Sequence, residues 1–288
     1  MWMKFRPVYF LLSGTALVFS VFALSSWGLK QSIDFTGGSV VEYSLGAQTT
    51  SDRLKEVITS KQYPLNGERI ISSKEVELRF PADFDQAKAQ EIASELGEDT
   101  KVLRFESVGP ILSAEILKKT YVALGIASVG ILLWVAWQFK SLQFGVCAIL
   151  ATLHDTTILL GTFAALGHFQ GIEVDILFVT AILTVLSFSV HDTIVVYDRI
   201  RETRRKQGRD LPLSLIADKA LSQTMVRSFN NSLTIIFMLT ALYLMGGTTI
   251  KWFVFALLVG TISGTYSSPF VAVPLLVTWD ELKRKIKR

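Results

Sequence analysis

The sequence predicts a polytopic α-helical membrane protein, with six transmembrane helices and one extracytoplasmic α+β domain between helices 1 and 2. Three observations support this class. Of the 288 residues, 50% are hydrophobic and only 19% are charged, and the mean hydropathy is +0.41. The charges are absent from several long stretches, and most of the acidic residues fall in residues 30–119. This composition excludes a disordered chain, and a single cysteine excludes a disulfide scaffold.

Six stretches are long and apolar enough to cross a bilayer, which takes roughly 20 residues. Four carry no charge, and two carry only a His-Asp pair: Pro7–Leu29, Thr120–Phe139, Ser228–Ile250 and Trp252–Trp279, then Ser141–Gly167 and Ile176–Tyr197. We expect the first stretch to be a retained helix and not a cleaved signal peptide. It is longer than a signal sequence requires, and Ser25–Gly28 is a poor cleavage site.

The distribution of Lys and Arg predicts the topology. Basic residues gather before the first stretch, in the segment 199–227 and in the tail 280–288. We therefore expect both termini in the cytoplasm, the chain in the cytoplasmic (inner) membrane and the α+β domain outside. The expected divisions are 1–29 (N-terminus and first helix), 30–119 (domain), 120–279 (five helices with a basic cytoplasmic loop at 199–227) and 280–288 (basic tail). Since topology explains the basic runs, we predict a lipid bilayer and no nucleic acid as their partner.

The segment between the first two helices alternates between strand and helix patterns. We expect six elements, Ser39–Leu45, Ser51–Gln62, Arg69–Ser73, Glu75–Phe80, Asp83–Leu96 and Thr100–Phe105. Their order is βαββαβ, the ferredoxin-like split-βαβ arrangement. The chain contains no nucleophile–base set, metal cluster or phosphate loop, so the sequence predicts a binding or lever module, no metal, no cofactor and no enzyme.

Two apolar helices carry polar faces. On the fourth, one stripe contains Thr180, Thr184, Ser187, His191 and Asp198, with Asp192 at its flank. On the fifth, one face contains Arg227, Asn230, Asn231, Thr234 and Met238. An ionisable residue at the centre of a membrane costs roughly 2.5–3.5 kcal/mol on insertion scales and so suggests function. We expect Asp192 and Arg227 to pair between neighbouring helices.

This chemistry suits proton carriage, since burial and a nearby arginine shift a carboxyl in opposite directions. A purely structural ion pair between Asp192 and Arg227 is the alternative. His191 is either a relay or a helix–helix hydrogen-bond partner. Asp155, which follows His154, is either a relay or a partner of backbone or of a neighbouring hydroxyl.

Three weaker features concern helix geometry. Residues Leu211–Leu221 have the pattern of a short amphipathic helix on the inner membrane surface. Gly260 and Gly264 form a small-xxx-small contact site on the sixth helix. Pro269 and Pro274 are expected to bend that helix.

Six motifs occur in a recognisable order: Asp34-Phe-Thr-Gly37-Gly38, Ser107-Val-Gly109-Pro110, Asp192-Thr-Ile-Val-Val-Tyr-Asp198-Arg199-Ile-Arg201-Glu202, Arg227-Ser-Phe-Asn-Asn-Ser-Leu-Thr, Gly246-Gly247 and Gly264-Thr-Tyr266-Ser267-Ser268. Across essentially the whole chain they resemble the SecF family, which belongs with SecD and the RND-type transporters. One departure is His191, where the family often has asparagine before the aspartate.

The resemblance implies an accessory subunit of the bacterial Sec protein-export machinery. Such a subunit pairs with a SecD-like half and associates with the SecYEG translocon, and YajC and YidC are further candidate partners. It uses a proton or sodium gradient to pull a translocating polypeptide outward in the late steps of export. It implies ion coupling by Asp192 and Arg227, to which His191 and Asp155 are added as candidates. The motif residues Asp34, Gly37, Gly38, Gly109 and Pro110 are expected to be structural or hinge positions.

Two alternatives remain open at the level of sequence. One is an RND-type exporter of a small molecule or lipid, which would need a ligand cavity in or between outer domains. The other is a passive translocon scaffold, in which neutral replacement of Asp192 and Arg227 leaves function intact. The chain shows no six-helix internal duplication, so the second half of a paired transporter must be another chain or another copy.

Overall fold

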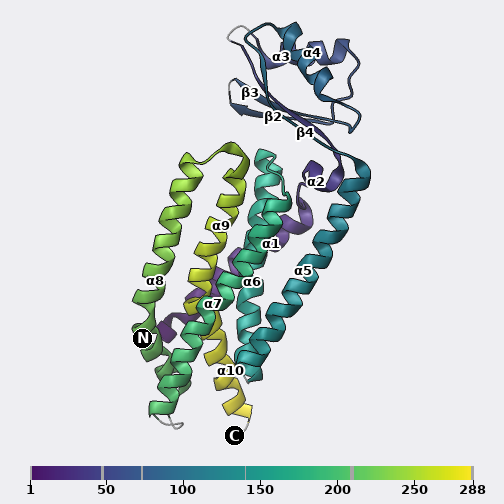
Figure 1. Ribbon diagram of the computed structural model, residues 1–288. Helices are drawn as coiled ribbons and strands as arrows, with labels where there is room; N and C mark the ends of the chain where they lie inside the picture. Colours follow the sequence, from purple (N-terminus) through teal and green to yellow (C-terminus); the bar gives the residue numbers. More distant parts are fainter. Residues whose placement is uncertain (1, 47–48, 73, 140, 208–210, 287–288) are drawn as a thin grey trace. The chain divides into compact units, whose positions relative to one another are not determined.

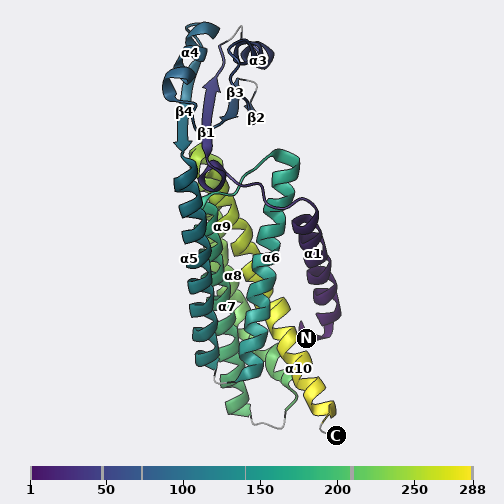
Figure 2. The same ribbon diagram turned by 90° about the vertical axis from the view of Figure 1, so that its right-hand side faces the viewer.

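The computed structural model describes every residue except 1, 47–48, 73, 140, 208–210 and 287–288. It divides into two compact units, one containing Met1–Lys30 and Ala123–Arg288 and the other Gln31–Val122. The first is a bundle of long helices, and the second is an α+β domain (Figures 1 and 2). Helix α5 (Pro110–Phe139) belongs partly to each unit.

Six helical segments in the described chain are long and apolar enough to cross a membrane. They are η1 with α1 (Trp2–Phe5 and Arg6–Ser26), α5, α6 (Leu142–Gln170), α7 (Ile176–Gln207), α8 (Leu213–Met245), and α9 with η2 and α10 (Thr248–Ser267, Ser268–Ala272 and Val273–Ile286). Each of the six predicted apolar stretches lies mostly in one of these segments, so the predicted fold class is confirmed. Two stretches were drawn too long, since Pro7–Leu29 passes the end of α1 at Ser26 and Ser228–Ile250 passes the end of α8 at Met245. Within the bundle α7 packs against α6, α8 and α9, and α1 packs against α6.

The expected loop at 199–227 is largely helical, which corrects the prediction. Helix α7 continues to Gln207, and α8 begins at Leu213. The separate surface helix expected at Leu211–Leu221 is also wrong, since all but its first two residues form the start of α8. The physical reason is burial: Leu213, Ile216, Ala217, Ala220 and Leu221 pack in one core cluster with residues of α7 and α10. Residues 208–210 of the expected loop lie outside the described residues.

The last membrane segment is interrupted at the proline that was predicted to bend it. Five residues, Ser268–Ala272, form a π-helical turn between α9 and α10. Pro269 is in its first turn and lacks the N–H that an α-helix would use. The π turn matters for the site, because it orients Ser268 toward α7, where its hydroxyl bonds Thr193 at 3.1 Å.

The second unit is a four-stranded sheet with two helices. Its strands are β1 (Gly38–Ser44), β2 (Gly67–Ser72), β3 (Glu75–Phe80) and β4 (Lys101–Val108), its helices are α3 (Ser51–Ser60) and α4 (Gln86–Leu96), and the short α2 (Ile33–Thr36) precedes them. The sheet order is β2-β3-β1-β4 with every neighbouring pair antiparallel. Strand β3 thus lies between β1 and β2, which α3 connects, and the predicted βαββαβ order is confirmed.

Helix boundaries in this unit follow from side-chain caps. Thr50 accepts a hydrogen bond from the Arg53 N–H at the start of α3. Asp85 accepts from the Lys88 N–H at 2.9 Å, so α4 begins at Gln86 instead of at the expected Asp83. The apolar faces of α3 and α4 bury a single core cluster against one face of the sheet, with Tyr43 and Leu78 at its centre and fully buried.

Candidate ion-coupling site

Asp192 lies on α7 in the interior of the helix bundle. Its side chain is buried, with 7% of the residue exposed, and its Oδ1 accepts a hydrogen bond of 2.6 Å from Ser228 Oγ of α8. Its Oδ2 is buried without a hydrogen-bond partner in the described chain, although the Ser268 hydroxyl is near enough to interact with the carboxyl group. Asp192 is therefore a buried carboxyl group with spare acceptor capacity.

The expected pair of Asp192 and Arg227 is not formed in the described part of the chain. No ion pair joins them there, and Arg227 is exposed on α8 while the next residue, Ser228, contacts Asp192. The helix phase places the arginine about 100° away from the serine. Neighbouring helices thus do meet at this point as predicted, but a hydroxyl occupies the position expected for the guanidinium.

The two polar faces predicted from helical periodicity are present, and both are exposed in this chain. Thr180, Thr184, Ser187, His191 and Asp198 are exposed on α7, and Arg227, Asn230, Asn231, Thr234 and Met238 are exposed on α8. His191 is thus directed away from the bundle, although it directly precedes the buried Asp192. The structure brings Asp192 to Ser228 and leaves Arg227 and His191 on the surface of the helix bundle.

Asp155 of α6 is fully buried, and both of its carboxyl oxygens have hydrogen-bond partners. Oδ1 accepts from Ser263 Oγ at 2.6 Å and contacts His154 Nδ1 at 3.0 Å. Oδ2 accepts from Ser189 Oγ at 2.6 Å and from Ser267 Oγ at 2.5 Å. We call these four partners the Asp155 cage. An ionised carboxylate accepts hydrogen bonds at both oxygens, so this geometry fits the charged form.

Of the two alternatives for Asp155, contact with neighbouring hydroxyls is the arrangement observed. The sequence analysis did not identify Ser189, Ser263 and Ser267 as its partners. One signal was available, because Ser263 and Ser267 are four residues apart and share one face of α9. Nothing in the sequence indicated that this face meets α6, or that Ser189 is buried while Ser187 is exposed.

The predicted glycine contact site lies between α9 and α7. A Cβ atom added at Gly260 would be 2.0 Å from Val185 Cγ2, and one at Gly264 would be 3.3 Å from the Phe188 ring. These short approaches let α9 come close enough to α7 for Ser263 and Ser189 to reach the same carboxylate.

The two glycine-containing motifs around the α+β unit meet each other. Gly37 and Gly38 have φ angles of +73° and +123°, and a Cβ at Gly38 would be 2.9 Å from the Phe80 carbonyl oxygen. A Cβ at Gly37 would be 3.4 Å from Pro110 Cα, so the second motif packs on the first. Gly109 has nothing within 4 Å of such a Cβ, and Asp34 lies in α2, where Ser32 caps its N–H. The backbone angle and the close carbonyl oxygen at position 38 thus favour glycine, whereas the surroundings of Gly109 leave space for a side chain.

Among the described residues, no group of three or more His, Cys, Asp and Glu residues has a geometry that suits a metal ion. The candidate site consists of one carboxyl with an unused oxygen, a second in a hydroxyl cage, and polar helix faces. Ionisable side chains buried among membrane helices are costly, and they commonly mark ion pathways and proton relays.

Comparison with known proteins agrees with the motif resemblance. A family model described as protein export membrane protein SecD/SecF, C-terminal, matches residues 88–282, and the SecD/SecF GG motif matches residues 22–48. Protein translocase subunit SecF of Thermobaculum terrenum is 40% identical, with 96% of this chain and 93% of the relative covered. Protein translocase subunit SecF of Anaerolinea thermophila is 36% identical, with 96% of this chain and 92% of the relative covered.

Longer relatives place SecD and SecF in one chain. Protein translocase subunit SecDF of Brucella abortus is 34% identical over 87% of this chain, which spans 33% of that protein. The crystal structure of SecDF from Thermus, titled a translocon-associated membrane protein, matches with a TM-score of 0.84 and 30% identity, over 97% of this chain and 38% of that one. These matches cover both units and all six membrane segments, and the chain belongs to the SecD/SecF family of protein export membrane proteins.

Proposed function

We propose that this chain, as an accessory subunit of the Sec protein translocase, works with a SecD-like partner and uses the proton or sodium motive force to drive late steps of protein export. The observation that carries the proposal is Asp192, a buried carboxyl group that accepts from Ser228 at one oxygen, while its other oxygen has no hydrogen-bond partner among the described residues. An ionised group in that state is costly in a bundle interior, so a bound proton or Na⁺ stabilises it. Its contact with Ser228 gives a change at Asp192 a direct route to α8.

A partner is supported by the exposed polar faces of α7 and α8. Asn230, Asn231 and Arg227 are exposed on α8, in a stretch that is apolar enough to lie in a membrane. Polar side chains at that depth almost always face protein or water instead of lipid. We propose that helices of a SecD-like chain cover these faces, which is consistent with the SecDF relatives, and that Arg227 finds its carboxylate or water partner there.

We further propose the topology that the basic residues favour, with both termini in the cytoplasm and the α+β unit outside. In this orientation that unit holds the emerging polypeptide and the helix bundle moves it. The SecYEG translocon, with YajC and YidC as further candidates, then supplies the chain that is pulled. The ion-coupled role has no catalytic residue and requires no cofactor.

The test is Asp192→Asn in the full chain with its partners, assayed for gradient-stimulated export of a secreted protein into membrane vesicles. We expect normal insertion and loss of most of the stimulation, because the amide keeps the Ser228 contact but binds no proton. The matched control is Asp198→Asn, the same change on the same helix at an exposed carboxylate that pairs with Arg201. Equal stimulation in both variants would contradict the proposal and favour a passive scaffold.

A further inference from the structure

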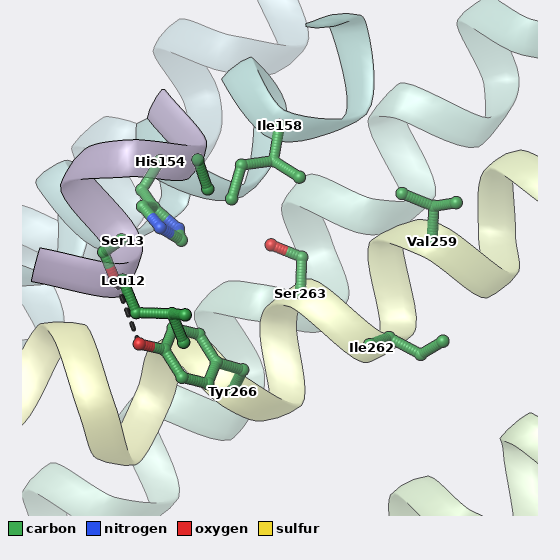
Figure 3. A pocket seen from close by; sticks show the side chains of 9 residues that line it. Leu12, Ser13, His154, Ile158, Val259, Ile262, Ser263 and Tyr266 are labelled. Carbon is green, nitrogen blue, oxygen red and sulfur yellow. Dashed lines mark hydrogen bonds between the residues drawn. The ribbon is translucent and has the colours of Figure 1, made fainter. Parts of the chain in front are cut away.

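A cavity of about 280 Å³ lies between α1, α6 and α9, beside the Asp155 cage. Most of its lining is aliphatic, and its polar residues are His154, Ser13, Ser263 and Tyr266 (Figure 3). Ser13 Oγ and Tyr266 Oη are 3.1 Å apart and bonded, and the Tyr266 ring is stacked on the ring of His154, with the centroids 6.4 Å apart. A single water needs about 10–15 Å³ of such space and at least two polar partners, so water in this cavity would have to lie at the wall formed by His154, Ser13 and Tyr266, since the rest of the lining is apolar.

The two ring nitrogens of His154 lie in different surroundings, Nδ1 beside Asp155 and Nε2 in the wall of the cavity. Its side chain is 2% exposed, and Nδ1 lies 3.0 Å from Asp155 Oδ1. Nε2 is buried and has no hydrogen-bond partner in the described chain, and the ring lines the cavity (Figure 3). Because an ionised carboxylate only accepts, Nδ1 carries the hydrogen in the neutral ring. Nε2 then carries an unused lone pair that is buried in the wall of the cavity.

We propose that His154 and Asp155 form a second proton-binding site, in which His154 takes a proton from water in this cavity and passes it to Asp155. This inference rests on the proposed ion-coupled function and deepens it, since it identifies the proton as the ion at this site. It also assigns a role to His154. The class of ligand is a hydrogen-bond donor able to release a proton, namely water or hydronium.

The transfer balances with the groups present. A proton from a hydronium ion binds the Nε2 lone pair, which leaves a water and an imidazolium whose Nδ1–H still donates to Asp155 Oδ1. The Nδ1–H bond then breaks as the O–H bond to Oδ1 forms, which leaves a neutral ring with its hydrogen on Nε2 and a neutral Asp155. The His154–Asp155 hydrogen bond is kept with donor and acceptor exchanged, so no polar group loses its partner.

The cage can accommodate both charge states. Ser267 donates to Asp155 Oδ2 at 2.5 Å and has a second acceptor, the Gly264 carbonyl oxygen, at 3.3 Å. When Asp155 becomes neutral and a weaker acceptor, the Ser267 hydroxyl can turn to that carbonyl. The titratable groups that face the pair are Asp192 from α7 and Tyr266 from α9, and α1 contributes the hydroxyl of Ser13.

The test uses the full chain in lipid bilayers with ¹⁵N-labelled histidine, followed by solid-state NMR through a pH titration. The three histidines are His154, His168 and His191. We expect His154 to show the Nδ1–H tautomer at high pH and to gain a second proton at Nε2 as the pH falls. An Nε2–H tautomer at high pH, or an unchanged protonation state throughout, would overturn the inference.

A second measurement follows the carbonyl stretch of protonated Asp155 by infrared spectroscopy after a pH jump, with Asp155→Asn to assign the band. His154→Asn retains an N–H near the position of Nδ1 but has no proton-accepting nitrogen. We expect it to slow protonation of Asp155 on the order of 100-fold, the typical contribution of a positioned proton-transfer group. His168→Asn, which alters an exposed ring stacked on Trp27, is the matched control and should leave the rate unchanged.

An unchanged rate in His154→Asn would overturn the relay. Neither measurement depends on export. If Asp192→Asn exported normally while these readouts held, the proposed function would fail and the proton site would stand.

Discussion

At the scale of single residues, charge placement could be predicted from the sequence and the bonding of those charges could not. Asp192 and Asp155 stood out because they interrupt apolar stretches, and Arg227 because it directly precedes one. Whether each has a partner depends on helix rotation and packing between segments far apart in the chain. Ser228 therefore meets Asp192 where Arg227 was expected, and the Asp155 cage joins α6, α7 and α9 across more than 100 residues.

Removal of one cage hydroxyl should destabilise the bundle. In Ser267→Ala, Asp155 loses a 2.5 Å donor, and hydrogen bonds to charged groups contribute about 1.5–3 kcal/mol. We expect a loss of that size in the free energy of unfolding, measured by denaturation in mixed micelles. Ser187→Ala, at an exposed position on α7, should change it by less than about 0.5 kcal/mol. Similar losses in the two variants would show that the cage is not a stabilising network.

Glu42 of β1 should make the α+β unit less stable at neutral pH. Burial, together with the charges of Glu77 and Glu75, raises the pKa of Glu42 above its usual value, and Glu77 lies directly opposite it in the sheet. Because the folded state then binds the proton more tightly than the unfolded state, stability falls as the pH rises from the ordinary glutamate range through the raised pKa.

Glu42→Gln should therefore protect the sheet amides against hydrogen exchange at neutral pH. Like charges directly opposite one another destabilise a sheet by a few tenths to about 1 kcal/mol, and the gain should be of that size. The difference from the unmodified chain should vanish under acidic conditions, below the ordinary glutamate pKa. A difference that does not change with pH would contradict the electrostatic explanation.

At the scale of elements, the apolar stretches and the βαββαβ order were predicted because each follows from local periodicity and turn residues. Helix ends in the bundle were missed, since burial of residues such as Ile216 extends α8 well beyond the apolar stretch. The small-xxx-small site was found in the sequence, but its partner helix was not. That partner, α7, is determined by the shape of both helix surfaces.

The contact between α7 and α9 should depend on Gly260 more than on Gly264. A methyl group at Gly260 would meet Val185 at 2.0 Å, whereas one at Gly264 would be 3.3 Å from the edge of the Phe188 ring. Overpacking typically costs about 1–3 kcal/mol, so we expect Gly260→Ala to lower the free energy of unfolding by that amount and Gly264→Ala by clearly less. A larger cost for Gly264→Ala, in the same micelle assay, would show that the helix contact is wrong.

At the scale of the whole molecule, the chain has the features of one half of a paired transporter. Its predicted polar faces exist but are exposed, and SecDF relatives contain this chain's fold in about a third of their length. A single sequence shows which faces are polar, but it does not contain the surface that covers them. For this reason, neither the surface of the partner nor the identity of the coupled ion could be predicted from this sequence.

Asn231→Leu should weaken association with the SecD-like partner. Hydrogen bonds between membrane helices average about 0.6 kcal/mol and reach about 1.7 kcal/mol, so we expect a roughly three- to eighteenfold lower ratio of copurified partner in mild detergent. Thr15→Leu, at an exposed position on α1 outside the polar faces, is the control and should leave the ratio unchanged. Equal recovery with both variants would indicate that this face of α8 is not the contact surface.

The central claim is that ion binding at Asp192 is coupled to export. The most direct measurement is the export rate as a function of an imposed proton or sodium gradient, in vesicles that contain the full complex with unmodified chain, Asp192→Asn or Asp198→Asn. The account predicts a rate that rises with one of the two gradients for the unmodified chain and for Asp198→Asn, and a rate independent of both for Asp192→Asn. A rate that rises equally in all three would contradict it.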